Sequence, residues 1–203
     1  MPILTSELIE RFNLQVDDSS ELSGEEELGL ANEVYGDVQN DRSWEWLKKT
    51  FTGTMSTSLD YIALPVDFKY LVPNKDERSV VFVGAEYSEY KVVGFSQRRE
   101  YRNQNGYCYI DQSTSRLYFT LQPISAKSVE YDYIKVANAL TVSTAPIFAE
   151  RFSNIIPYGM AAKFNPIELS DKQTSYQLEN SLAYRKILSD MQIEDAYIKL
   201  STG

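Results

Sequence analysis

The spacing of the apolar residues changes twice along this chain, and this limits the folds that the chain can adopt. Up to about residue 60 the apolar residues recur every three or four positions, as on one face of a helix. From Leu64 they recur at every second position, which is typical of half-buried strands, and after Pro146 the helical spacing returns. We therefore expect an α+β protein, in which the N- and C-terminal helices form a helical bundle with an inserted antiparallel β subdomain.

The same changes predict the domain boundaries. Residues 1–62 would supply the N-terminal helices of the bundle, residues 63–145 the antiparallel β subdomain, and residues 146–203 the C-terminal helices and a tail. Both helical sections carry apolar stripes, and a helix must bury its apolar face against another element. We therefore expect the two sections to pack together.

The N-terminal section contains signals for three helices. Thr5–Asn13 has one apolar face, and Ser23 with Glu26 predicts a capping box at the start of a second helix. A third helix would begin at Asp41 or Ser43. Its apolar residues at helical spacing are Trp44, Leu47 and Phe51.

Trp46 is a candidate contact residue in that third predicted helix. Positions two apart on a helix diverge by about 200°, so Trp46 would point outward if Trp44 joins the core. An outward Trp is a candidate contact with another subunit. The alternative is that the long C-terminal helix covers Trp46.

The middle of the chain contains five runs rich in β-branched and aromatic residues. Asn105 and Gly106 suit a two-residue turn, which predicts a hairpin between Tyr101 and Tyr107. The expected strands are Val80–Val83, Lys91–Phe95, Tyr107–Asp111, Arg116–Gln122 and Ser128–Val136.

Arg98, Arg99 and Arg102, interleaved with Tyr101, form the one locally basic and aromatic stretch of the sequence. A solvated hairpin arm would explain these residues without any function. The functional alternative is a contact with a nucleic acid or with an acidic partner surface.

After Pro146 we expect two helices and a tail. The first contains Pro157, which predicts a kink or break, and stops at Asn165-Pro166. The second begins near Ser170 and continues to about Met191. Residues 193–203 would then extend beyond the helix as a tail that docks on another subunit. Tyr197, Ile198 and Leu200 would be its apolar contact residues.

The chain contains no histidine, which removes the Ser-His-Asp triad, the Cys-His dyad and every His-ligated metal site. Its nine glycines form no nucleotide-binding loop, and no histidine is available to activate the single cysteine, Cys108. We therefore expect no catalytic activity, no cofactor and no metal. Catalysis by a carboxylate pair stays open, because 29 acidic residues always offer pairs.

The charge of the chain opposes unassisted binding to phosphate backbones or anionic membranes. Acidic residues exceed basic ones by 29 to 20, which gives a net charge of -9. Residues 1–50 hold 12 acids and 4 bases, so most of this excess is N-terminal. We expect no secretion signal, because the N-terminus lacks a basic start and an apolar stretch. We expect no membrane protein, because the longest uncharged run, Val136 to Ala149, is too short and too polar to span a bilayer.

Short motifs follow the N-terminal helices in a fixed order. Leu64-Pro65-Val66-Asp67-Phe68 comes first, Leu121-Gln122-Pro123 follows the predicted hairpins, and Tyr131-Asp132-Tyr133 precedes the helix that Pro146 introduces. Over nearly the whole chain, this order resembles the head-tail adaptor family of tailed bacteriophages, also called connector or head-completion proteins.

The resemblance implies a non-enzymatic virion structural protein that forms a ring, usually of twelve copies, in the phage neck. The ring would connect the portal to the tail and extend the DNA channel. Its partners would be other copies of itself, the portal protein and the next neck or tail protein. Genomic DNA would pass through the lumen without sequence-specific binding. Such a protein is made in the cytoplasm of the bacterial host and resides in the virion neck.

An acidic lumen suits this role, because each neutralised phosphate would add affinity and hold the DNA back. The tail could then dock on a neighbouring subunit or on the portal. Two other classes stay open: a different virion part, such as a tail-completion or baseplate subunit, and a small enzyme with carboxylate catalysis. The candidate interface residues are Trp46, Arg98, Arg99, Arg102, Tyr197, Ile198 and Leu200.

Overall fold

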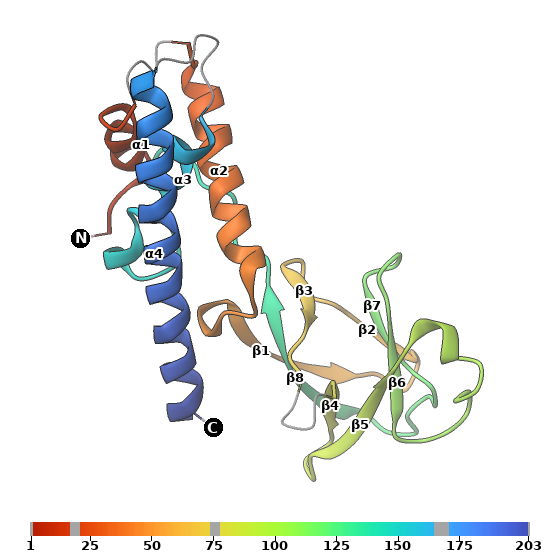
Figure 1. The fold of residues 1–203 in the computed structure, drawn as a ribbon. Coiled ribbons are helices and arrows are strands. Elements are labelled where there is room, and N and C mark those ends of the chain that lie inside the picture. The colour runs from red at the N-terminus through yellow and green to blue at the C-terminus, as the bar shows by residue number, and fades with distance from the viewer. Residues whose placement is uncertain (1, 17–20, 74–77, 165–170, 203) are drawn as a thin grey trace. The chain divides into compact units, whose positions relative to one another are not determined.

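The computed structural model describes residues 2–16, 21–73, 78–164 and 171–202 (Figure 1). The chain divides into two compact units. The helical unit comprises Met1–Trp46 and Ala137–Gly203, and the β unit comprises Leu47–Val136.

The predicted fold class is wrong. The structure is not a helical bundle with an inserted small β subdomain, because it consists mostly of a large, nearly closed sheet of eight strands with a long C-terminal helix. The sheet begins at Lys48, within the segment expected to be the third helix. It is also mixed rather than purely antiparallel, since β5 and β6 run parallel.

The strand order in the sheet is β1-β8-β4-β5-β6-β7-β2, and β3 also pairs with β8. β8 is the central partner, because it pairs with β1 along eight residue positions and with β4 and β3 on its other side. The strands are β1 (Lys48–Met55), β2 (Tyr61–Ala63), β3 (Phe68–Leu71), β4 (Val80–Val83), β5 (Ser88–Val93), β6 (Tyr107–Asp111), β7 (Arg116–Phe119) and β8 (Lys127–Lys135).

The inner face of this sheet buries the alternate residues of its strands. Val81 and Val83 of β4 and Leu117 and Phe119 of β7 are buried while their neighbours are half-buried, as a period of two requires. The core of the β unit contains Met55, Ile62, Leu71, Val81, Val83, Tyr90, Cys108, Leu117, Phe119, Val129, Tyr131 and Tyr133.

The hairpin predicted at Asn105-Gly106 is wrong. Residues 94–106 connect the parallel strands β5 and β6, so they form a crossover that contains a short 3-10 turn at Phe95–Gln97. Gly106 does have a positive φ of 86°, but this turn leads into β6 alone. The hairpin of this region lies between β6 and β7, where Ser115 has a φ of 52°.

The helical unit contains α1 (Thr5–Asn13), α2 (Gly24–Asp41), α3 (Ile155–Lys163) and α4 (Asp171–Thr202). The first two helices confirm local predictions: α1 has the expected bounds, and Ser23 and Glu26 form the capping box of α2. Pro157 lies in the first turn of α3, a position that tolerates proline, and so breaks no helix. The stop at Asn165-Pro166 and the start at Ser170 lie outside the described residues.

Gly159 lies where α3 packs closely against α2 and α4. A methyl group there would overlap the side chain of Val34 and lie 3.0 Å from Cδ2 of Tyr184. We expect Gly159→Ala to lower the free energy of unfolding of the helical unit by about 1–3 kcal/mol, although alanine is the better helix former. Urea unfolding followed by Trp fluorescence measures this unit selectively, because both tryptophans, Trp44 and Trp46, belong to it.

The matched control for Gly159→Ala is Gly29→Ala in α2. Gly29 is exposed, and a Cβ there would meet nothing within 4 Å. This change should stabilise the unit by up to about 1 kcal/mol. A gain in stability at both positions would contradict the close packing of α3.

Candidate interaction surfaces

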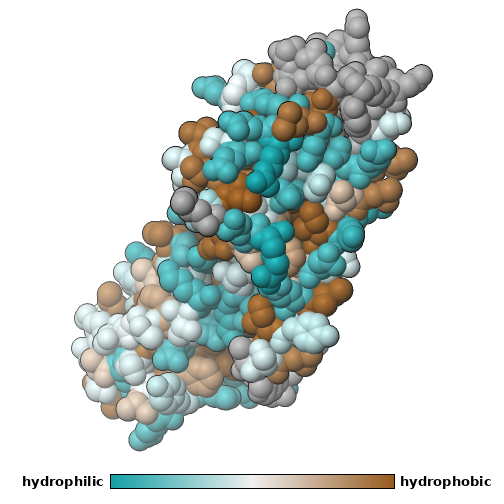
Figure 2. All heavy atoms as spheres, turned by 90° about the vertical axis from the view of Figure 1, so that its left-hand side faces the viewer, coloured by the Kyte–Doolittle hydropathy of each residue, from teal (hydrophilic) through white to brown (hydrophobic). Residues whose placement is uncertain are grey.

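α4 carries apolar residues on two faces. Its inner face is buried in the helical unit, with Met191 only 2% exposed. At about 100° per residue, five other apolar residues fall within an arc of about 100° on the opposite side. All five are more than half exposed, and we call them the outer stripe: Leu178, Leu182, Ile193, Tyr197 and Leu200. In Figure 2, apolar residues form brown patches between teal polar ones on the helical unit.

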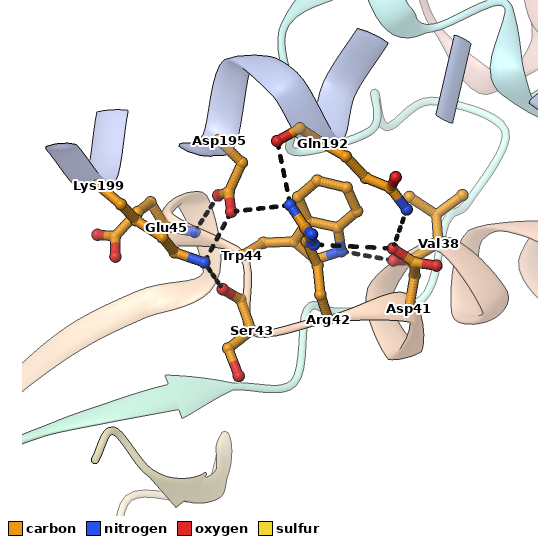
Figure 3. A network of polar contacts seen from close by, with 9 residues as sticks. All are labelled: Val38, Asp41, Arg42, Ser43, Trp44, Glu45, Gln192, Asp195 and Lys199. Carbon is orange, nitrogen blue, oxygen red and sulfur yellow. Dashed lines mark hydrogen bonds and ion pairs between the residues drawn. The ribbon is translucent and has the colours of Figure 1, made fainter. Parts of the chain in front are cut away.

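A buried carboxylate fixes the C-terminal half of α4 (Figure 3). Asp195 is 2% exposed, and its Oδ1 accepts a hydrogen bond of 2.7 Å from the backbone N–H of Glu45. Its Oδ2 lies 2.7 Å from Nζ of Lys199 and 3.8 Å from Nη1 of Arg42. Among the described residues, none donates a well-aligned hydrogen bond to Oδ2, so the two cations compensate it through their charge.

Further hydrogen bonds join the same part of α4 to the end of α2 and to the turn that follows α2. Arg42 donates to the carbonyl oxygen of Gln192 at 3.0 Å, and the Gln192 side chain donates to Asp41 at 2.9 Å. Lys199 donates to the carbonyl oxygen of Ser43 at 2.6 Å. These contacts fix the inner face of α4 between Gln192 and Lys199 (Figure 3).

The predicted C-terminal tail is wrong, because α4 continues through Ile193 to Thr202. Of the three candidate contact residues of this segment, Tyr197 and Leu200 lie on the outer stripe, at 69% and 81% exposure. Ile198 lies about 100° away from Tyr197 around the helix and is 40% exposed. The structure therefore places these residues on a fixed helix.

Trp46 does not diverge from Trp44, because the two residues lie in or beside a 3-10 turn (Glu45–Leu47) instead of an α-helix. The two rings stack at 5.7 Å with 27° between their planes, and Trp46 also meets Phe148 edge to face at 5.7 Å. Trp46 is half-buried, while Trp44 is fully buried. A role of Trp46 in a subunit contact stays a prediction.

The three arginines of the basic stretch meet around one polar pocket in the β unit. The pocket has a volume of about 370 Å³ and is lined by Arg98, Arg99, Arg102, Asp60, Asn103, Tyr109, Phe119, Thr120 and Gln122. Arg99 and Arg102 are exposed, and Arg98 is half-buried. Burial, together with the charge of Asp60, raises the pKa of Tyr109. We call this site the arginine pocket.

A row of aromatic rings begins at Tyr109 in the wall of the arginine pocket. Tyr109 of β6 stacks on Tyr118 of β7 at 5.3 Å, and Tyr118 meets Tyr61 of β2 at 5.4 Å. Phe95 meets Tyr109 on the other side at 6.0 Å. Guanidinium groups cover both ends of this aromatic row: Arg98 lies 3.8 Å from the Phe95 ring centre and Arg116 lies 4.0 Å from that of Tyr61.

Sequence reasoning found the three arginines but missed most of what surrounds them. The aromatic row depends on the pairing of β6, β7 and β2, which no local pattern specifies. Asp195 also gave no signal, because a charged residue in a helix is normally exposed. The outer stripe could have been found, since Ile193, Tyr197 and Leu200 recur at helical spacing.

Cys108 lies in the core of the β unit with its side chain fully buried. Burial raises the pKa of its thiol, because the thiolate would be poorly solvated there. The thiol therefore stays protonated at neutral pH and is screened from solutes.

The described residues contain neither a candidate metal site nor a helix that could span a membrane. Within these residues, no three His, Cys, Asp or Glu side chains are grouped so that they could hold a metal ion. None of the described helices is both long and apolar enough to cross a membrane. Comparison with known proteins gives no matching protein family and no significant match to a curated protein.

Proposed function

We propose that this protein is a non-enzymatic structural component of a phage virion and forms a ring in the neck. The ring would connect the portal to the tail and extend the DNA channel. The observation that carries this proposal is the outer stripe of α4, which presents five exposed apolar residues on a helix whose other face is already buried.

A second apolar face on one helix favours self-assembly. Subunits of a ring contact their neighbours through two different surfaces, and such contacts need aromatic or aliphatic anchors with polar surroundings. Tyr197 and Leu200 can serve as anchors, while the exposed Lys186 and Ser189 supply polar surroundings. The polar contacts of Asp195 hold the helix in place, which lowers the entropy lost on association.

The motifs behind the family resemblance occupy structural positions in the β unit. Asp67 of the Leu-Pro-Val-Asp-Phe motif accepts a hydrogen bond of 2.8 Å from the hydroxyl of Tyr133, and Phe68 stacks on the Tyr133 ring at 5.7 Å. The two motifs therefore contact each other and support the sheet. Such structural roles are what the resemblance implies for these motifs.

The test is the assembly state of the purified full-length protein, by analytical ultracentrifugation and negative-stain electron microscopy. We expect closed rings built from the 23.3 kDa chain. The variant Tyr197→Ser/Leu200→Ser should stay monomeric with an unchanged circular dichroism spectrum, because its changes are confined to exposed side chains.

The matched control is Val66→Ser/Ile124→Ser, which removes two exposed apolar residues of the β unit. This variant should still form rings. Wild-type protein that remains monomeric at every concentration would contradict the proposed function, and so would rings that tolerate the loss of Tyr197 and Leu200.

A further inference from the structure

The arginine pocket is positively charged, whereas the chain as a whole is negatively charged. Its lining contains three arginines and one aspartate, while the whole chain has a net charge of -9. Arg98 donates to the carbonyl oxygen of Phe95 at 2.7 Å. Among the described residues, Arg99 and Arg102 form no ion pair. The pocket therefore presents cationic hydrogen bond donors to an anionic ligand.

The aromatic row favours carboxylates over nucleobases as that ligand. A nucleobase would stack on an open ring face, but Tyr109 and Tyr118 stack on each other with only 9° between their planes. Arg98 and Arg116 cover the rings at the two ends. The faces that Tyr109 and Tyr118 turn toward each other are thus closed to a base, and aromatic edges carry positive partial charge, which attracts carboxylates. This surface therefore suits acidic side chains.

The chain itself contains an acidic surface of complementary charge. Three consecutive glutamates, Glu25, Glu26 and Glu27, form the first turn of α2, and Glu25 and Glu26 are exposed. Glu26 is occupied by the capping box with Ser23. Glu25 and Glu27 form no ion pair with any described residue. The carboxylates of Glu25 and Glu27 are thus available to the guanidinium groups of Arg99 and Arg102.

We infer that the arginine pocket of one copy binds the acidic first turn of α2 in the next copy. Each subunit would use its pocket toward one neighbour and its acidic turn toward the other, which is the head-to-tail contact that a ring requires. The forked guanidinium groups of Arg99 and Arg102 would bind the carboxylates of Glu25 and Glu27. This inference rests on the proposed ring.

The test reverses the charges of the pocket, then those of the acidic turn of α2, and finally both together. Arg99→Glu/Arg102→Glu should raise the protein concentration needed for rings about tenfold or more, and Glu25→Lys/Glu27→Lys should do the same. A chain with all four changes should form rings again, because the charges are complementary once more. Glu26 stays unchanged to preserve the helix cap, and circular dichroism checks that each variant is folded.

The matched control reverses two basic residues of the β unit outside the pocket, Lys91→Glu/Lys127→Glu, and should leave assembly unchanged. Rings that tolerate the pocket variant would overturn this inference and leave the proposed function standing. Wild-type protein without rings would overturn both. Binding of a single-stranded oligonucleotide that is lost in the pocket variant, with assembly intact, would assign the pocket to nucleic acid and overturn the inference.

Discussion

Replacement of Trp44 by alanine should lower the free energy of unfolding of the helical unit by about 3–5 kcal/mol. Trp44 is fully buried, and its Nε1 donates a hydrogen bond of 2.6 Å to the carbonyl oxygen of Val38. Its ring also stacks on Trp46. The substitution would leave a cavity and remove the hydrogen bond to the Val38 carbonyl oxygen, and both changes destabilise the folded state.

Urea unfolding followed by far-ultraviolet circular dichroism measures this loss, because the helices supply most of that signal. The control is Trp46→Ala, which removes a half-buried ring from the same turn and should cost clearly less. Equal losses for the two variants would show that Trp44 is not the main packing residue of this turn.

Replacement of Asp195 by alanine should cost the helical unit about 2–3 kcal/mol. The backbone N–H of Glu45 would lose its acceptor, and Arg42 and Lys199 would lose their shared counter-ion. Breaking a fully buried ion pair costs about 3–5 kcal/mol. The side chains of Arg42 and Lys199 are 37% and 40% exposed, so water would compensate part of their charge and reduce the loss.

The neighbouring position provides the control for Asp195→Ala. Glu194 pairs with Arg151, whose side chain is 62% exposed, and a surface ion pair of this kind contributes at most about 1 kcal/mol. Fluorescence of Trp44 and Trp46 during urea unfolding measures both variants. If Asp195→Ala costs no more than Glu194→Ala, the buried carboxylate does not anchor α4.

The sequence by itself determined the elements whose signals are local. The bounds of α1, the Ser23–Glu26 capping box and the strands Val80–Val83 and Tyr107–Asp111 all match the predictions made from spacing and caps. A helix cap involves residues three positions apart, and strand alternation is visible within five residues. Such features depend little on the rest of the chain.

Tertiary structure alone decided the secondary structure of residues 48–55. Trp44, Leu47 and Phe51 fit helical spacing, but Lys48–Met55 forms β1 and pairs with β8 over its whole length. The Phe51 ring stacks on Tyr131 at 4.8 Å, eighty positions away in the sequence. Contacts with a distant strand therefore outweighed the local spacing.

For the two candidate surfaces, too, the sequence showed the residue types and only the fold decided their surroundings. The sequence showed three arginines within five positions, but only the fold brought Asp60 and Gln122 beside them in one pocket. The sequence also showed that Tyr197 and Leu200 are apolar residues near the C-terminus, but its pattern predicted that they lie in a tail. Asp195 and Lys199 instead bind backbone groups of Ser43 and Glu45, and these contacts, formed across about 150 positions of sequence, support the helix as far as Thr202. Charge and apolar content can be counted in any sequence, whereas the partner of each side chain depends on which distant segments the folded chain brings together.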